Sequence, residues 1–398
     1  MSVNLVDVRA ASGVIEGICL RTPMISAATF SEWCGFPIAL KAENLQRTGS
    51  FKLRGGTNRI ANMTADERSR GVVAASAGNH AQGIALAARS AGVAARVYMP
   101  LGSSIAKQQA AIGYGAEVVL AGETFDDAQR AATSDPDGRV FVSAFDDRHI
   151  IAGQGTLGLE VLEDAPDLDT IVVPLGGGGL LGGIAVAVKA LRPDVRVVGV
   201  QAAGCASYLA SLAAGAPVAA PFATTIADGI AVKRPGDLTF PLVQRFVDEI
   251  VEVDEAEICR AIIALLERSK LLVEGGGAAG LAALLSGRVR GGNVVCVLSG
   301  GNLDAGLLQS IVRFGLDASG RFLKLRTTMP DRPGSLSRVL AVLAEGRINV
   351  LDVEHHREAL HLGVSDVSCL ITVETRGDDH ADDVLELVRQ AGYPAERV

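Results

Sequence analysis

Between about residues 70 and 313, short apolar runs alternate with segments whose apolar residues recur at helical spacing. Apolar runs bounded by turn residues are typical of buried strands, and apolar residues three or four positions apart are typical of one helix face. Strands are predicted at residues 72–75, 96–99, 117–120, 171–175, 195–200 and 294–298, and helices from 79, at 104–114 and at 180–191. We therefore expect an α/β fold of βαβ units with mostly parallel sheets, whose binding loops follow the carboxyl ends of strands.

The pattern changes near residues 313–320, which we interpret as a linker. Beyond it the chain is more charged, and strands and helices follow one another in a different order. The prediction is a strand at 321–327, a helix at 334–344, strands at 347–354 and 364–373, a helix at 379–391 and a short last strand. This order is that of a ferredoxin-like α+β module. Two domains are thus expected, at residues 1–312 and 321–398.

Composition limits the classes of protein and partner. Of the 398 residues, 48% are apolar and 21% charged, which is typical of a globular enzyme, and the net charge of −8 argues against a nucleic-acid partner. Residues 170–188 are uncharged, but Pro174 and several glycines interrupt them, so no membrane span is expected. Six scattered cysteines without a C-x-x-C pair, and the lack of a signal-peptide pattern, indicate a cytoplasmic protein without a metal site.

Four consecutive glycines stand between the predicted strand at 171–175 and the helix at 180–191. A turn of this kind exposes several backbone N–H groups beside the positive end of a helix dipole, which favours binding of a phosphate. The spacing Gly177-x-Gly179-x-x-Gly182 also matches a dinucleotide fingerprint, but that site needs an acidic residue at the end of the next strand. Gln201 stands there instead. A phosphate without a ribose is therefore the better interpretation, and a nucleotide-binding regulatory protein stays as an alternative.

Three further motifs contain the remaining candidate chemistry: Ser-Phe-Lys-Leu-Arg-Gly at 50–55, Ser-Ala-Gly-Asn-His-Ala-Gln-Gly at 76–83 and Ser-Gly-Gly-Asn at 299–302. With the four glycines, in this order and spacing, they resemble the pyridoxal-phosphate enzymes of the serine/threonine dehydratase family, in particular its threonine dehydratase branch. The resemblance covers about residues 5–312. The C-terminal part resembles an ACT regulatory domain, with residues 331–336 at its ligand loop.

The resemblance implies a two-lobed, tryptophan-synthase-β-like fold, with a smaller lobe at about residues 54–150 and a cleft between the lobes. Lys52 would hold pyridoxal 5'-phosphate as a Schiff base and move the substrate's Cα proton. Phe51 would pack against the cofactor ring, Asn79 would bond its hydroxyl, and Ser299 would face its pyridine nitrogen. The phosphate would be bound by Gly176, Gly177, Gly178, Gly179 and Leu180, and the substrate carboxylate by the loop that contains Ser76, Gly78, Asn79 and His80.

The reaction so implied is β-elimination of L-threonine, and also of L-serine, to a 2-oxo acid and ammonia. Serine racemases of this family carry a second serine where this chain has Ala77, so racemisation is the less favoured alternative, beside hydroxyaspartate dehydration. Some members bind a divalent ion where this chain has Gln201, Cys205 and Ser207, so we expect no metal there. Glu274 fits a family glutamate near the cofactor, or simply a charge at a helix N-terminus.

For the C-terminal module, the resemblance implies binding of an amino-acid effector at Gly334 and near Asn349. A branched-chain amino acid such as isoleucine is the expected effector, and pairing of such domains across subunits would make the protein a homo-oligomer, a dimer or a tetramer. His355 and His356 are adjacent on a predicted strand, where neighbouring side chains point to opposite faces. They are therefore interpreted as part of an exposed strand rather than as a metal site.

Overall fold

The computed structural model describes residues 2–221, 223–318, 320–356 and 365–398. The chain divides into two compact units, Met1–Leu307 and Leu308–Val398. Helix α14 (Ala305–Ala318) begins in the first unit and continues into the second, so part of the predicted linker at 313–320 is helical. The domain limits given above remain predictions.

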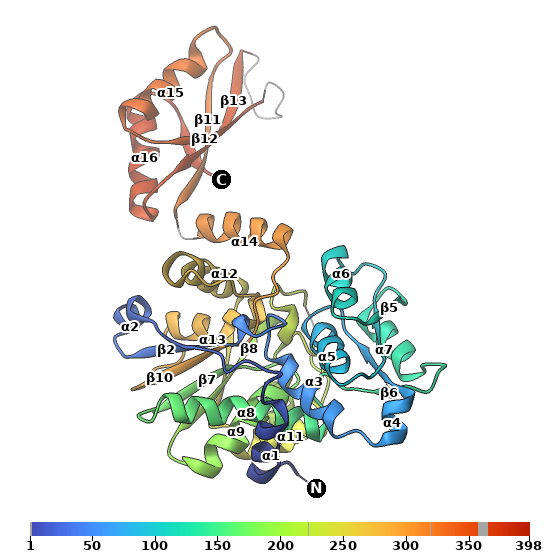
Figure 1. Ribbon diagram of the computed structural model, residues 1–398. Coiled ribbons are helices and arrows are strands. Elements are labelled where there is room, and N and C mark those ends of the chain that lie inside the picture. The colour runs from blue at the N-terminus through green and yellow to red at the C-terminus, as the bar shows by residue number, and fades with distance from the viewer. Residues whose placement is uncertain (1, 222, 319, 357–364) are drawn as a thin grey trace. The chain divides into compact units, whose positions relative to one another are not determined.

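The first unit contains a six-stranded sheet in the order β1-β2-β10-β7-β8-β9, drawn among the helices α8 to α13 in Figure 1. Its strands are β1 (Met24–Ser26), β2 (Ile38–Ala42), β7 (Thr170–Pro174), β8 (Arg196–Ala202), β9 (Glu249–Val253) and β10 (Val294–Leu298). Only β1 pairs antiparallel, with β2. The other neighbours pair parallel. Strands β7 and β10 are buried along their whole length, which explains their uninterrupted apolar sequences.

A second, wholly parallel sheet has the order β5-β4-β3-β6 and lies beside the first in Figure 1. Its strands are β3 (Val72–Ala75), β4 (Ala95–Met99), β5 (Glu117–Leu120) and β6 (Val140–Phe141). We call this sheet with helices α4 to α7 the small lobe, and the six-stranded sheet with helices α8 to α13 the large lobe. Each lobe has its own buried apolar cluster, one around Val72 and Val97 and the other around Val173 and Val197.

Helices of the first unit connect and cover these sheets. They are α1 (Leu5–Ile15), α2 (Ala28–Cys34), α3 (Lys52–Ala61), α4 (Ala65–Arg70), α5 (Asn79–Ser90), α6 (Ile105–Gly113), α7 (Phe125–Thr133), α8 (Arg148–Asp164), α9 (Gly179–Leu191), α10 (Ser207–Ala214), α11 (Thr239–Phe246), α12 (Glu255–Ala264) and α13 (Gly275–Leu285). Short 3₁₀ turns stand at Glu43–Leu45, Ala203–Cys205 and Asp228–Ile230, and a π-helical turn at Leu265–Ser269.

Beyond α14, the second unit is a four-stranded antiparallel sheet in the order β12-β13-β11-β14 with the two helices α15 and α16. Its elements are β11 (Phe322–Pro330), α15 (Ser335–Glu345), β12 (Val350–His356), β13 (Asp366–Glu374), α16 (Asp378–Gln390) and β14 (Ala395–Arg397). Leu323 and Leu325 of β11 are buried with Val339 of α15 and Val384 of α16, so alternate residues of the strand form the core of this unit. The sequence analysis predicted a strand at 321–327, and β11 begins one residue later and continues to Pro330.

The predicted fold class, an α/β unit with mostly parallel sheets followed by a ferredoxin-like α+β unit, is confirmed. Strands 72–75, 117–120 and 294–298 have the predicted bounds, whereas position 364, the predicted start of another strand, lies outside the described residues. The sequence analysis missed β2 and β9, because Lys41 and two glutamates interrupt their apolar patterns. His355 and His356 lie exposed on β12, as predicted. Within the described residues, no helix is long and apolar enough to cross a membrane.

Candidate active site

Three predicted binding loops follow the carboxyl ends of β3, β7 and β10. The loop after β10 is joined to the start of α3 by backbone contacts. Ser50 and Gly300 form an antiparallel bridge, in which the Phe51 N–H donates to the Ser299 carbonyl oxygen at 3.1 Å and the Gly301 N–H to the Gly49 carbonyl oxygen at 2.9 Å. These two bonds fix Lys52, the first residue of α3, next to the end of the large-lobe sheet.

Lys52 is partly buried, and its Nζ donates to the Ala144 carbonyl oxygen at 2.9 Å. The same Nζ lies 5.0 Å from the centre of the Phe51 ring. Burial lowers the pKa of Lys52 to about 8, against the opposing attraction of the Glu274 carboxylate. An amine with this pKa has a neutral, nucleophilic fraction near neutral pH, which an ordinary surface lysine lacks.

Asn79 begins α5 in the small lobe and is bonded at both ends of its amide. Its Nδ2 donates to Glu274 Oε1 at 2.6 Å, and its Oδ1 accepts from Asn302 Nδ2 at 2.7 Å. Burial raises the pKa of the Glu274 carboxyl to about 7, and the nearby charge of Asp228 acts in the same direction. Glu274 precedes α13 without capping it through its side chain, so its polar contact is with Asn79.

The four glycines form a buried turn into α9 that has no room for side chains. A Cβ at Gly176, Gly177, Gly178 or Gly179 would approach a neighbouring atom within 2.9, 2.3, 1.9 and 3.0 Å, respectively. Behind the turn, Thr239 Oγ1 donates to the Gly177 carbonyl oxygen at 2.6 Å, and Tyr208 Oη lies 3.2 Å from the same oxygen. Among the described residues, the buried N–H groups of Gly176, Gly177, Gly178, Gly179 and Leu180 find no hydrogen-bond acceptor.

Unpaired N–H groups buried at a helix start require an anionic or polar partner. The turn therefore fits a phosphate group, as the sequence predicts.

A hydrogen bond within the loop after β3 joins a side chain to the backbone. Ser76 Oγ accepts from the Gly78 N–H at 3.1 Å, and Gly78 precedes α5 without a side-chain cap. The His80 ring is buried and lies 2.9 Å from the Val142 carbonyl oxygen, away from the helix start. Burial and the nearby Lys52 lower the pKa of His80 to about 3, so its ring is neutral. The His80 side chain therefore has its contact within the protein and does not cap the start of α5.

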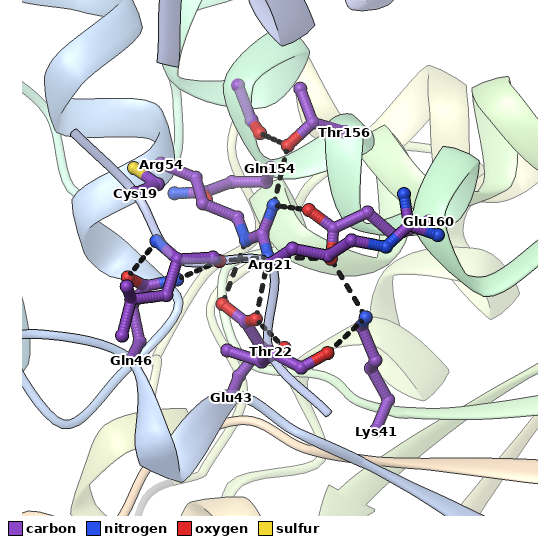
Figure 2. A network of polar contacts seen from close by, with 12 residues as sticks. Cys19, Arg21, Thr22, Lys41, Glu43, Gln46, Arg54, Gln154, Thr156 and Glu160 are labelled. Carbon is purple, nitrogen blue, oxygen red and sulfur yellow. Dashed lines mark hydrogen bonds and ion pairs between the residues drawn. The ribbon is translucent and has the colours of Figure 1, made fainter. Parts of the chain in front are cut away.

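Arg54 follows Lys52 by two positions and is completely buried. Its guanidinium makes two bonds to Glu43, at 2.9 and 2.8 Å, and two to Glu160 of α8, at 2.6 and 3.0 Å. Figure 2 shows this cluster, with the Lys41 ammonium 2.8 Å from the same Glu160. The first turn of α3 is thereby held to β2, to the 3₁₀ turn that follows it and to α8, which fixes the backbone from which Lys52 projects.

Gln201, which replaces the acid of a dinucleotide site, uses its side chain within the protein. Its Oε1 accepts from the Tyr208 N–H at 3.1 Å, and its Nε2 donates to the Cys205 carbonyl oxygen at 3.4 Å. The amide is buried and has no access to a ribose. In the part of the chain that the structure describes, no group of three or more His, Cys, Asp or Glu residues is arranged to hold a metal ion.

A partly buried lysine with a lowered pKa, a turn with unpaired N–H groups and an amide held by two hydrogen bonds fit pyridoxal phosphate. A family model for pyridoxal-phosphate-dependent enzymes matches residues 15–300, and one for ACT domains matches 324–391. The chain belongs to the pyridoxal-phosphate-dependent enzyme family. It is 45% identical over 394 residues to an L-threonine ammonia-lyase of Thermotoga maritima, with 98% of each chain covered, and 48% identical over 377 residues to one of Geobacter sulfurreducens, with 94% of each covered.

Among solved structures, maize serine racemase is similar, with a TM-score of 0.75 and 33% identity over 80% of this chain and 99% of that one. In the present chain, the ACT match at residues 324–391 includes both residues predicted to bind an effector. Gly334 precedes α15 with φ of 88°, and Asn349 Nδ2 donates to Glu374 Oε2 at 3.1 Å.

The sequence analysis assigned no role to Asn302, Tyr208, Thr239 or the Ala144 carbonyl. Asn302 ends one of the quoted motifs, so a signal for it was present in the sequence. No local signal marks the other three, because only the tertiary fold brings them to the glycine turn and to Lys52.

Proposed function

We propose that this protein is a threonine ammonia-lyase, which converts L-threonine, and also L-serine, to the corresponding 2-oxo acid and ammonia. The observation that carries the proposal is the partly buried Lys52, with its pKa of about 8, together with the glycine turn whose buried N–H groups have no acceptor among the described residues. The names of the two relatives, both L-threonine ammonia-lyases matched over nearly the whole chain, support the choice of substrate.

Each part of the site has one binding task in this proposal. Lys52 would hold pyridoxal phosphate, and Phe51 would border its ring. The glycine turn, from Gly176 to Leu180, would bind the phosphate, while Asn79 would hold the ring hydroxyl and Ser299 the ring nitrogen. The loop of Ser76, Gly78, Asn79 and His80 binds the substrate carboxylate through backbone N–H groups at the start of α5.

When bound, pyridoxal phosphate supplies an electron sink for the charge that develops at the substrate Cα. The Lys52 amine would remove the proton from the substrate Cα, and the hydroxyl would leave Cβ together with a proton, as water. The enamine that is set free takes up water and loses ammonia, so that threonine gives 2-oxobutanoate. Ser299 has a hydroxyl rather than a carboxylate, so it does not hold the ring nitrogen charged, which favours prompt loss of the β-substituent.

Serine racemisation is the second candidate, because maize serine racemase shares the fold. It needs a proton donor on the face of the substrate opposite Lys52. The residue after Ser76 is alanine in this chain, which has no hydroxyl to offer. We therefore expect elimination to exceed racemisation of L-serine, as measured by chiral chromatography of the residual amino acid together with the 2-oxo acid formed.

The test of the main proposal is trapping of the cofactor. Purified protein should be yellow, and borohydride should abolish the colour and leave the adduct on Lys52 in a peptide map. The purified wild-type protein should also release 2-oxobutanoate from L-threonine. The Lys52→Ala variant should give neither the reduced adduct nor 2-oxobutanoate. A protein that stays colourless after incubation with pyridoxal phosphate would overturn the proposal. Reduction of a different lysine would overturn the assignment of Lys52.

For the ACT domain we propose a branched-chain amino-acid effector that binds near Gly334 and Asn349, in a homo-oligomeric cytoplasmic enzyme. All six cysteines are free, which suits a reducing compartment. Isoleucine or valine should change the threonine concentration that is needed for half-maximal rate. Asn349→Ala should weaken that response, while its rate without effector should equal that of the wild type. Light scattering on the eluting protein should give a dimer or a tetramer. A monomer would contradict the proposed homo-oligomer. An unchanged response to the effector in Asn349→Ala would contradict the proposed effector site.

A further inference from the structure

The side chain of Asn302 links three segments at the cofactor site. Its Nδ2 donates to the Thr48 carbonyl oxygen at 2.7 Å and to Asn79 Oδ1 at 2.7 Å. The Asn79 Nδ2 then donates to Glu274 Oε1 at 2.6 Å. Thr48 precedes Lys52 by four residues, and Asn302 follows the end of β10, a strand of the large lobe. Asn79 begins α5 in the small lobe. One amide group therefore connects both lobes.

The Thr48 carbonyl sets the direction of this hydrogen-bond chain. A backbone carbonyl only accepts, so the Asn302 atom that faces it has to be the donor Nδ2. The same Nδ2 faces Asn79, whose nearest atom must then be the acceptor Oδ1. This leaves the Asn79 Nδ2 pointing at Glu274. The oxygen and nitrogen of an asparagine amide could otherwise be exchanged. Here the Thr48 carbonyl fixes the orientation of the Asn302 amide, and through it that of the Asn79 amide.

Gly49 makes room for this contact. Its φ is +71°, and a Cβ at this position would lie 2.3 Å from Asn302 Oδ1 and 2.9 Å from its Cγ. Gly49 also accepts the Gly301 N–H through its carbonyl at 2.9 Å, so the two loops are held against each other. Any side chain here would have to displace the Asn302 amide from Asn79.

We propose that Asn302 is a positioning residue that fixes the Asn79 amide with its donor end toward Glu274 and the cofactor's ring oxygen. This inference rests on the proposed function, in which Asn79 meets the ring hydroxyl. A donor at that oxygen stabilises its negatively charged form, whereas the opposite amide orientation would place an acceptor there. Asn302 thus acts on the cofactor through Asn79, without touching the reacting atoms.

The test compares two substitutions that remove the donor and keep the size of the side chain. Asn302→Asp replaces the donor with an acceptor and adds a charge, and Asn302→Leu removes the donor without charge. In both variants the ratio of the absorption bands of the bound cofactor should change, and its release should become about tenfold faster, as expected for loss of one hydrogen bond. Only Asn302→Asp should also shift the pH midpoint of the band change upward, because its negative charge retains a nearby proton.

A matched control is Asn4→Asp, the same chemical change at the exposed cap of α1, where a carboxylate accepts the same backbone bonds. It should leave the spectrum, the release rate and the activity unchanged. A second, independent variant is Gly49→Ala, which should reproduce the spectral change of Asn302→Leu although residue 302 is intact. Thermal unfolding separates a local effect from loss of the fold.

The outcomes distinguish this inference from the proposed function. If the wild type is yellow and labelled at Lys52, but both residue-302 variants keep the wild-type band ratio and release rate, Asn302 has no positioning role. The same conclusion follows if kcat and KM of Asn302→Leu equal those of the wild type. A wild type without cofactor absorption would instead contradict the proposed function itself.

Discussion

The guanidinium of Arg54 and the carboxylate of Glu43 form a completely buried ion pair, joined by bonds of 2.9 and 2.8 Å. Burial alone would raise the pKa of Glu43, but the charge and hydrogen bonds of Arg54 outweigh it and hold that pKa below its ordinary value. Arg54 stands two positions after Lys52, so the Lys52 amine projects from a backbone that this ion pair holds in place.

Replacing Arg54 with methionine should destabilise the protein by about 3–5 kcal/mol, because the buried Glu43 would lose its ion-pair partner, whereas Glu160 would keep its ion pair with Lys41. Denaturant unfolding of the wild type and the variant measures the difference. Arg54→Met combined with Glu43→Gln should recover part of the loss, since no buried carboxylate would then remain at position 43. Arg70, whose ion pair with Asp66 is exposed on both sides, provides the control: Arg70→Ala should cost less than about 1 kcal/mol. Equal losses for the two arginines would contradict the prediction.

The raised pKa of Glu274 predicts a particular dependence of stability on pH. Its pKa is about 7 in the folded protein, against the ordinary 4.5, so the folded state holds this proton more tightly than the unfolded chain. The resulting stabilisation is complete below about pH 4.5 and is lost as pH rises through about 7. Glu274→Gln cannot ionise and should therefore become more stable than the wild type above pH 8, by about 3 kcal/mol.

Unfolding of the cofactor-free proteins between pH 5 and 9 would measure this difference. At pH 5 the two proteins should differ little, because Glu274 is then protonated and resembles glutamine. Glu16→Gln, at an exposed position, is the control that should show no such trend. A wild type that gains stability relative to Glu274→Gln as pH rises would have the opposite sign and would refute the raised pKa.

Much of this fold could be predicted from the sequence, because its signals are local. The strand at 72–75 is a short apolar run between turn residues, and the four glycines mark their turn without any knowledge of the rest. The contacts that organise the site are different. Asn79 and Asn302 are 223 positions apart, and Arg54 and Glu160 are 106 apart. A single sequence contains the residues of such pairs but not their pairing, which depends on how the sheets and helices pack.

At the glycine turn, Gly178→Ala should strongly reduce affinity for pyridoxal phosphate. Gly178 has φ of +91°, and a Cβ there would lie 1.9 Å from Tyr208 Oη, so the start of α9 would have to move. Titration of cofactor-free protein, followed by absorbance, measures the affinity. Gly215 has a similar φ of +70° but open space around its Cα, so Gly215→Ala tests backbone strain alone. That control should lose about 1–2 kcal/mol of stability and no affinity. Equal affinities for the two variants would show that the Tyr208 contact has no role.

Lys107 of the small lobe and Asp228 of the large lobe form an ion pair at 2.9 Å, and their charges act in opposite directions on the pKa of Glu274. The Asp228 side chain is largely exposed, so solvent and salt screen the pair, and it should be worth less than about 1 kcal/mol. Lys107→Glu should therefore raise the KM for threonine by no more than about fivefold at low salt, because two negative charges would then face each other between the lobes.

The exchange variant Lys107→Asp with Asp228→Lys restores opposite charges and should return KM toward the wild-type value, while the difference among all variants should shrink at high salt. The Lys189–Asp248 pair, which lies within the large lobe, is the matched control, and Lys189→Glu should leave KM unchanged. If the exchange variant keeps the raised KM of Lys107→Glu, the pair does not act through its charges. In that case the effect of Lys107→Glu comes from a local change in α6, and the contact between the lobes would depend on Asn79 and its partners instead.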